Sequence, residues 1–287
     1  RSQGDSWVQN HAGFLIVILL FLAIKIYMLA VQKGISWDGA VYVGMGKFIF
    51  SLGQVGLWEA SRPVLWPFLL GALWKVGLSP IFFGRLLAIL FSVGVLILVY
   101  RIGQRFFSRK VCLLAVMFLA FSPVFLFNSS TLLSGIPSTL FSLVAVHYFL
   151  EKRHFSSGFF VGLAFLTRYL QLFVAIPLVV ILLMVYKKDW KSSCCKLLGG
   201  LAFVFVPFAV LNAFAYGNVI YPLTLQVFMT KYTGWIYHQP WGFYVMDLFY
   251  QIPLWMFAVV ALWQFRKSVS ERWVVGLIFL MYFIFFS

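Results

Sequence analysis

Apolar runs separated by short polar or basic segments recur along the whole chain. They lie near residues 14–31, 64–79, 81–100, 111–126, 137–150, 157–186, 197–215, 248–265 and 273–287. A membrane-spanning helix needs about 20 mainly apolar residues, and several runs approach that length. The period-two alternation of a membrane β-barrel is absent. The pattern predicts an all-α, polytopic transmembrane helical bundle, in which residues 1–287 form a single integral membrane domain.

Basic residues gather in four of the segments between these runs. Loops rich in Lys and Arg stay on the cytoplasmic side, so these clusters constrain how often the chain crosses. Two clusters bracket the run 157–186, which must therefore cross an even number of times. This predicts two short helices that meet near Arg168–Gln171. The clusters are Arg101, Arg105, Arg109 and Lys110; Lys152 and Arg153; Lys187, Lys188, Lys191 and Lys196; and Arg266, Lys267 and Arg272.

The number of membrane crossings that keeps all basic loops on one side also decides how the run 64–79 is interpreted. A full crossing there would move the N-terminus to the face opposite the basic loops. Trp66, Trp74 and Lys75 instead suit a helix that lies at the membrane interface. We expect residues 32–79 to form a first external loop with interfacial helices, 125–137 a second, and 216–247 a late external loop. Because the sequence ends inside an apolar run, MYFIFFS, we expect it to be part of a longer chain.

Composition agrees with a membrane protein and narrows its partners. Hydrophobic residues make up 63% of the chain and charged residues 10%, whereas apolar residues are about half of a soluble domain. The net charge of +15 is explained by topology-setting loops, so we expect membrane lipid and no nucleic acid as a partner. The cysteines, at 112, 194 and 195, fall at predicted cytoplasmic helix ends, where a disulfide framework is not expected.

Against this background, Asp38, Glu59 and Arg62 stand out because they follow the first apolar span. A carboxylate at a membrane boundary is costly to keep and suggests a polar site at one face of the bilayer. Each residue also has a simpler explanation. Asp38 could cap a helix over 39–51, and Glu59 could form only a surface pair with Arg62. Arg85 and Arg168 could extend to the interface.

Several motifs, read in order, resemble one family. They are DGAVY at 38–42, RPVLWP at 62–67, YRIG at 100–103 with RFF at 105–107, SP at 122–123, LSGIP at 133–137, GLAFLTRY at 162–169 and GNVIYP at 217–222. Their order and spacing over residues 14–250 resemble the GT-C glycosyltransferases. Within these enzymes they resemble the dolichyl-phosphate-mannose-protein mannosyltransferase-like group, which includes the aminoarabinose transferases.

The resemblance implies a GT-C-like bundle that takes a sugar from a polyprenyl-phosphate donor at the outer face of the plasma membrane. The acceptor would be a lipid, a glycan or a protein. Asp38 would be the general base, with Glu59 as the other candidate catalytic carboxylate. The resemblance leaves open whether a divalent metal ion is a cofactor, and no residue is assigned as its ligand. The substrate-binding residues would be Tyr42, Arg62, Lys75, Arg85 and Arg168, with His238, Trp241 and Tyr244 from the late external loop.

Two glycines depart from the family pattern. The family usually reads Asp-Glu in the first loop and a carboxylate before Ile-Pro in the second, where this chain has Gly39 and Gly135. An inactive homologue with a binding or assembly role therefore stays open. A lipid-linked sugar transporter or flippase is the other alternative, and it predicts a repeat between the two halves of the chain. The sequence shows no such repeat.

Overall fold

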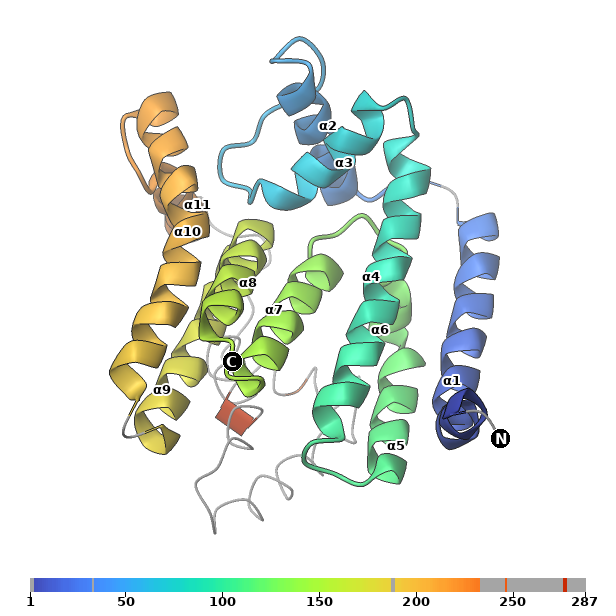
Figure 1. The fold of residues 1–287 in the computed structure, drawn as a ribbon. Coiled ribbons are helices and arrows are strands. Elements are labelled where there is room, and N and C mark those ends of the chain that lie inside the picture. The colour runs from blue at the N-terminus through green and yellow to red at the C-terminus, as the bar shows by residue number, and fades with distance from the viewer. Residues whose placement is uncertain (1–2, 33, 187–188, 233–245, 247–275, 278–287) are drawn as a thin grey trace. The chain divides into compact units, whose positions relative to one another are not determined.

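The computed structural model describes residues 3–32, 34–186, 189–232, 246 and 276–277. In this part of the chain, eleven α-helices and one 3-10 helix form and there is no strand (Figure 1), which confirms the all-α prediction. Among the described residues, three helical segments are long and apolar enough to cross a membrane, namely His11–Val31, Pro80–Gly103 and Trp190–Tyr216. The chain divides into two compact units, unit 1 (Arg1–Trp58 and Pro67–Leu140) and unit 2 (Glu59–Trp66 and Phe141–Ser287).

Unit 1 is built around the antiparallel helices α1 (Gln3–Val31) and α4 (Pro80–Gly103). At one end the ring of Phe14 stacks on Tyr100, with 4.3 Å between centroids. At the other end a guanidinium nitrogen of Arg85 donates to the carbonyl oxygen of Gln32 at 3.2 Å. The beginning of α1 therefore lies beside the basic turn that follows α4, and the end of α1 lies beside the start of α4.

Two short helices follow α1 and pack through glycines. These are α2 (Trp37–Phe50) and α3 (Leu65–Lys75). A Cβ atom added at Gly46 would lie 2.6 Å from the backbone nitrogen of Gly71, so a side chain at this crossing would force the helices apart. The 11 residues of α3 extend about 16 Å, roughly half of a bilayer core. That 64–79 does not cross the membrane, and that it lies at an interface, stay predictions.

The apolar run 111–126 is not one continuous helix. It divides into α5 (Arg109–Ala120) and α6 (Pro123–Asn128). Pro123 cannot continue a helix from the preceding turn, because it lacks the backbone N–H and its ring clashes with that turn. Ser122 starts the new helix, since its hydroxyl accepts a hydrogen bond from the backbone nitrogen of Phe125 at 3.3 Å. α7 (Gly135–Leu150) follows.

Unit 2 is held together by the parallel helices α8 (His154–Thr167) and α10 (Trp190–Tyr216), which run side by side in Figure 1. A Cβ atom at Gly158 would collide with the carbonyl oxygen of Leu197, and one at Gly162 would lie 2.6 Å from Cβ of Val204. Residues with higher numbers on α8 contact residues with higher numbers on α10, so the two helices are parallel. The Gly158–Gly162 spacing thus serves packing within the chain.

The run 157–186 is broken where the sequence predicted. α8 ends at Thr167, and a 3-10 helix (η1, Tyr169–Val174) leads into α9 (Ala175–Val185). The ring of His154, at the start of α8, lies 5.7 Å from that of Tyr186, just after α9. α8 and α9 therefore form an antiparallel pair of short helices with Arg168 at the junction. α11 (Tyr221–Tyr232) lies within the expected late external loop.

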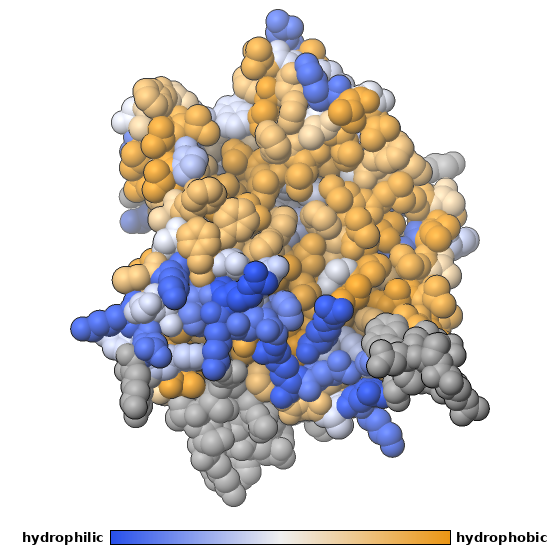
Figure 2. Space-filling view, in the orientation of Figure 1, coloured by the Kyte–Doolittle hydropathy of each residue, from blue (hydrophilic) through white to orange (hydrophobic). Residues whose placement is uncertain are grey.

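Large apolar side chains are exposed along the helices that could cross a membrane. Figure 2 shows hydrophobic surface over the visible faces of α4 and α10. On α4 they include Ile81, Phe82, Leu86 and Leu90, and on α10 Phe203, Val206, Leu211 and Phe214. Apolar side chains that would destabilise a protein in water are the expected covering of a helix in lipid. The chain is an integral membrane protein.

Candidate functional site

The first group of candidate residues begins α2 in unit 1. Ser36 is the N-cap, because its hydroxyl accepts a hydrogen bond from the backbone nitrogen of Gly39 at 3.2 Å. The alternative that Asp38 caps this helix is therefore wrong. Asp38 is half-buried in the first turn, where the helix dipole stabilises a carboxylate.

Gly39 stands where the family usually has a glutamate, and the structure gives this position little room. A Cβ atom at Gly39 would lie 3.0 Å from the hydroxyl of Ser36 and 3.2 Å from Cβ of Leu132. A side chain at this position fits only if Ser36 or the segment around Leu132 shifts slightly, and a glutamate would also need room for the rest of its side chain. Glycine, in place of the usual glutamate, thus stands where the first and second predicted external loops approach each other closely.

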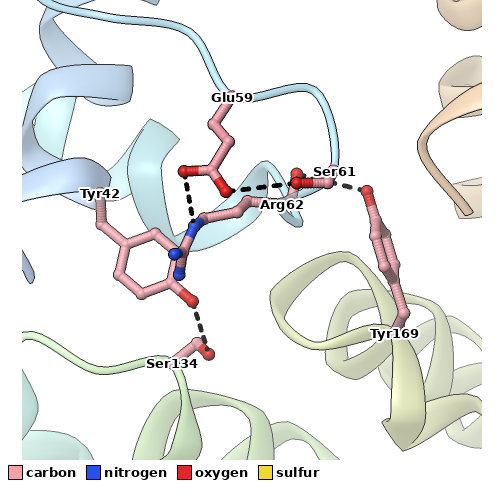
Figure 3. Close-up of polar contacts among 6 residues, drawn as sticks. All are labelled: Tyr42, Glu59, Ser61, Arg62, Ser134 and Tyr169. Carbon is pink, nitrogen blue, oxygen red and sulfur yellow. Dashed lines mark hydrogen bonds and ion pairs between the residues drawn. The ribbon is translucent and has the colours of Figure 1, made fainter. Parts of the chain in front are cut away.

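Tyr42 and Ser134 connect these two loops directly (Figure 3). Tyr42 lies one turn beyond Asp38 on α2 and is 6% exposed, and its hydroxyl lies 3.3 Å from Oγ of Ser134. Ser134 immediately precedes α7. The motifs DGAVY and LSGIP, far apart in sequence, therefore meet within unit 1.

A pocket of about 280 Å³ lies beside the start of α2. Its polar lining consists of Gln32, Ser36, Arg85 and Thr131. Arg85 is buried and donates to the carbonyl oxygens of Gln32 and Gly34, so it holds the connection between α1 and α2. The buried Oε1 of Gln32 has no hydrogen-bond partner among the described residues. A buried acceptor of this kind suits a hydroxyl-bearing ligand.

The second group lies in unit 2, around the segment Glu59–Trp66 (Figure 3). Arg62 Nε and Glu59 Oε2 form an ion pair at 3.0 Å, and the hydroxyl of Ser61 donates to Glu59 at 3.3 Å. The side chains of Arg62 and Glu59 are 21% and 33% exposed. The surface pair considered as the simpler explanation for Glu59 is therefore present. It leaves the guanidinium of Arg62 partly accessible.

Tyr169 joins Arg62 to the helix break at Arg168. Its hydroxyl donates to the carbonyl oxygen of Arg62 at 3.3 Å (Figure 3), and its ring packs on Phe165 and Phe208. Arg168 is exposed and extended, with φ −158° and ψ 116°, directly after α8. The structure thus anchors two candidate phosphate-binding arginines, distant in sequence, to one tyrosine.

The other predicted residues have separate positions or lie outside the described part. Lys75 is exposed in the last turn of α3, while His238, Trp241 and Tyr244 lie outside the described residues. Among the residues that the structure describes, no group of three or more His, Cys, Asp or Glu could hold a metal ion. Whether the protein uses a divalent metal stays a prediction.

Three polar residues that the sequence does not identify make contacts in the structure. Ser134 contacts Tyr42, Tyr169 contacts Arg62, and Lys25 contacts Leu126 and Ser130. For Lys25 the sequence does hold a signal, because a lone charge inside the apolar run 14–31 indicates function. It could have been found from the sequence, whereas the partners of Ser134 and Tyr169 could not.

The described helices are apolar, and Asp38, Arg62 and Arg168 lie near helix ends. This arrangement defines an integral membrane protein with polar sites at the ends of its helices. A model of the dolichyl-phosphate-mannose-protein mannosyltransferase family matches residues 61–211, more than half of the chain, and the chain belongs to this family. The family consists of membrane glycosyltransferases of the GT-C type. Comparison with curated proteins and with solved structures returned no match.

Proposed function

We propose that the protein transfers a sugar from a polyprenyl-phosphate-linked donor to a lipid, glycan or protein acceptor at the outer face of the plasma membrane. The observation that carries this proposal is the family match over residues 61–211. The matched region includes Arg62, Arg85 and Arg168. Asp38 and α2 precede it, and the resemblance of the DGAVY motif supports their part in the reaction.

Asp38 acts as the general base. Its carboxylate accepts the proton of the acceptor nucleophile while that nucleophile forms a bond to the anomeric carbon of the sugar. The bond between the anomeric carbon and the phosphate oxygen breaks, and its electron pair leaves with the polyprenyl phosphate. Asp38 is half-buried in the first turn of α2, so its carboxylate stays partly accessible, as a general base must be.

Arg62 and Arg168 bind the phosphate of the donor. Arginine suits this role because its planar guanidinium donates to two phosphate oxygens at once. Arg168 is exposed at the helix break, and Tyr169 ties this break to the backbone of Arg62. Glu59 then orients Arg62 through their ion pair. Arg85 is engaged with two carbonyl oxygens, which favours a role in shaping the pocket over direct phosphate binding.

The arrangement within each unit supports an outward-facing site. In unit 1 the basic turn after α4 lies at the end where Phe14 meets Tyr100, away from the start of α2. In unit 2 Lys152 precedes α8, Lys196 lies in the first turns of α10, and Arg168 is at the far end of α8. If the basic ends face the cytoplasm, α2 and Arg168 both face outward.

The proposal is tested with membranes that contain the protein and radiolabelled polyprenyl-phosphate sugars. We expect transfer of label to lipid, glycan or protein, and loss of transfer in an Asp38→Asn variant. Membranes with Asp189→Asn, an exposed carboxylate that precedes α10, serve as the matched control. Donor binding without transfer, across carriers of several lengths, would favour the inactive homologue that Gly39 and Gly135 leave open.

A further inference from the structure

Lys25 is a fully buried cation inside the first candidate membrane span. It lies in the segment His11–Val31, and its side chain is 0% exposed. Its ammonium donates to the carbonyl oxygen of Leu126 at 2.6 Å and to Oγ of Ser130 at 2.8 Å. The sulfur of Met28 lies 3.6 Å away. The three hydrogens of the ammonium thus have three acceptors, and no carboxylate of the described residues pairs with it.

A buried lysine in a membrane span is costly and needs an explanation. A lysine near a helix end often extends along the helix to the interface. Lys25 does not do so, because its side chain is buried and its ammonium points at α6 and the residues that follow it. The cost of burying the charge is offset by hydrogen bonds to one particular stretch of chain, residues 126–130.

That stretch leads directly to the residues that face α2. Leu126 is in the last turn of α6, where a cation also interacts favourably with the helix dipole. Thr131 and Leu132 line the pocket beside Arg85. Ser134 contacts Tyr42 at 3.3 Å. The segment from Leu126 to Ser134 is therefore anchored to α1 at one end and to α2 at the other.

We propose that Lys25 is a positioning residue whose buried ammonium anchors residues 126–134 and thereby sets their distance from α2, the helix that carries Asp38. Its effect on sugar transfer rests on the proposed function. The anchoring itself does not, because it can be measured in a protein that transfers nothing.

A disulfide reports the distance between the anchored segment and α2. A Cβ atom at position 39 would lie 3.2 Å from Cβ of Leu132, close to the spacing of about 3.5–4.5 Å found in disulfides. In the full chain, Gly39→Cys with Leu132→Cys should therefore cross-link quickly on mild oxidation. Adding Lys25→Met should slow cross-linking at least about tenfold, since losing a hydrogen bond to a charged group typically shifts an equilibrium by that much. An unchanged rate would overturn the proposal.

A second disulfide shows whether the fold is retained. A Cβ atom at Gly103 would lie 3.7 Å from Cβ of the native Cys112, at the far end of α4. Gly103→Cys should cross-link to Cys112 equally fast with and without Lys25→Met. If both disulfides slow, Lys25 stabilises the whole unit, and the local anchoring role is wrong. Lys25→Arg, which keeps the charge and donors, should restore most of the rate at positions 39 and 132.

Kinetics separate positioning from substrate binding. Lys25→Met should lower kcat at least about tenfold while KM for a polyprenyl-phosphate sugar stays within about twofold, and Lys25→Arg should recover part of kcat. A slowed 39–132 disulfide with unchanged kcat would overturn the catalytic consequence. No transfer by the parent chain would overturn the proposed function, while the disulfide rates would still decide the anchoring.

Discussion

The hydroxyl of Tyr42 lies 3.3 Å from Oγ of Ser134, and this contact joins two motifs that are far apart in the sequence. Tyr42 belongs to the motif that contains Asp38, and Ser134 to the motif in which Gly135 replaces a family carboxylate. Both side chains are buried. The two motifs that contain these residues therefore contact each other within unit 1, and changes in either motif should affect the position of α2.

Asp38→Asn should lower turnover at least about 100-fold, which is the low end for loss of a general base. Donor binding should change far less, because cations elsewhere bind the phosphate. Steady-state transfer from a labelled donor measures kcat, and equilibrium binding of the same donor measures affinity. Unaltered turnover would remove Asp38 from the mechanism and make Glu59 the next carboxylate to test.

Arg62→Gln should weaken donor binding by about 1.5–3 kcal/mol, the usual contribution of a hydrogen bond to a charged group. Glu59→Gln alone should have a smaller effect, since partly exposed ion pairs contribute at most about 1 kcal/mol. Donor binding is measured for both single variants and the double variant. If Arg62→Gln has no effect once Glu59 is replaced, Arg62 serves only the ion pair. Lys110→Gln, an exposed cation at the start of α5, is the matched control.

Gly200→Ala should destabilise the α8–α10 pair, whereas Gly199→Ala should not. A Cβ atom at Gly200 would collide with the carbonyl oxygen of Phe155 and lie 2.7 Å from the backbone nitrogen of Phe159. Overpacking of this kind costs about 1–3 kcal/mol. A Cβ atom at Gly199 meets only the side chain of Phe155, at 3.9 Å, so better helix propensity should leave stability equal or slightly higher. Thermal unfolding in detergent compares the two variants. Equal melting temperatures would contradict the glycine-mediated packing.

His154 should make the protein less stable in mild acid. It precedes the apolar run 157–186, and burial lowers its pKa below the usual 6.5, with the ammonium groups of Lys196 and Lys152 adding to the effect. The unfolded chain then binds the proton more tightly than the folded chain. Stability is therefore fully present above about pH 6.5, falls as the pH drops toward the lowered pKa, and levels off below it.

His154→Phe should remove this pH dependence while keeping the ring that packs against Phe149 and Tyr186. Melting temperatures at about pH 7.5 and about pH 5.5 are compared for the parent and the variant, a range that brackets the usual histidine pKa. If the His154→Phe variant loses as much stability in acid as the parent does, groups other than His154 cause the loss.

Topology can be tested with two exposed positions of unit 1. Gln54 follows α2 and Arg105 follows α4. With Cys112, Cys194 and Cys195 replaced by alanine, Gln54→Cys should react with an impermeant maleimide added to intact cells. Arg105→Cys should react only after permeabilisation, because the basic turn is expected in the cytoplasm. Labelling at position 105 but not at 54 in intact cells would reverse the proposed orientation.

Local features of the chain could be predicted because they depend on neighbouring residues. Apolar runs predicted α4 and α7 closely, since apolar length alone determines whether a helix is stable in lipid. Positive loops on both sides of 157–186 predicted the break at Arg168, which the structure has. The division of 111–126 was missed, although Ser122-Pro123 is a local signal for a helix start.

Contacts between distant residues could not be predicted. Lys25 is separated from Ser130 by 105 positions and Tyr169 from Arg62 by 107, and nothing in the sequence identifies such partners. Tertiary packing alone decided that Lys25 points at α6 and that Arg85 holds the end of α1. The capping of α2 by Ser36 in place of Asp38 is a local contact, with the backbone nitrogen of Gly39. The sequence determined which segments are apolar helices and which family the chain resembles, because periodicity, charge and motifs are local properties. The structure decided which polar groups meet, because a buried polar group must find a partner in whatever segment packing brings beside it.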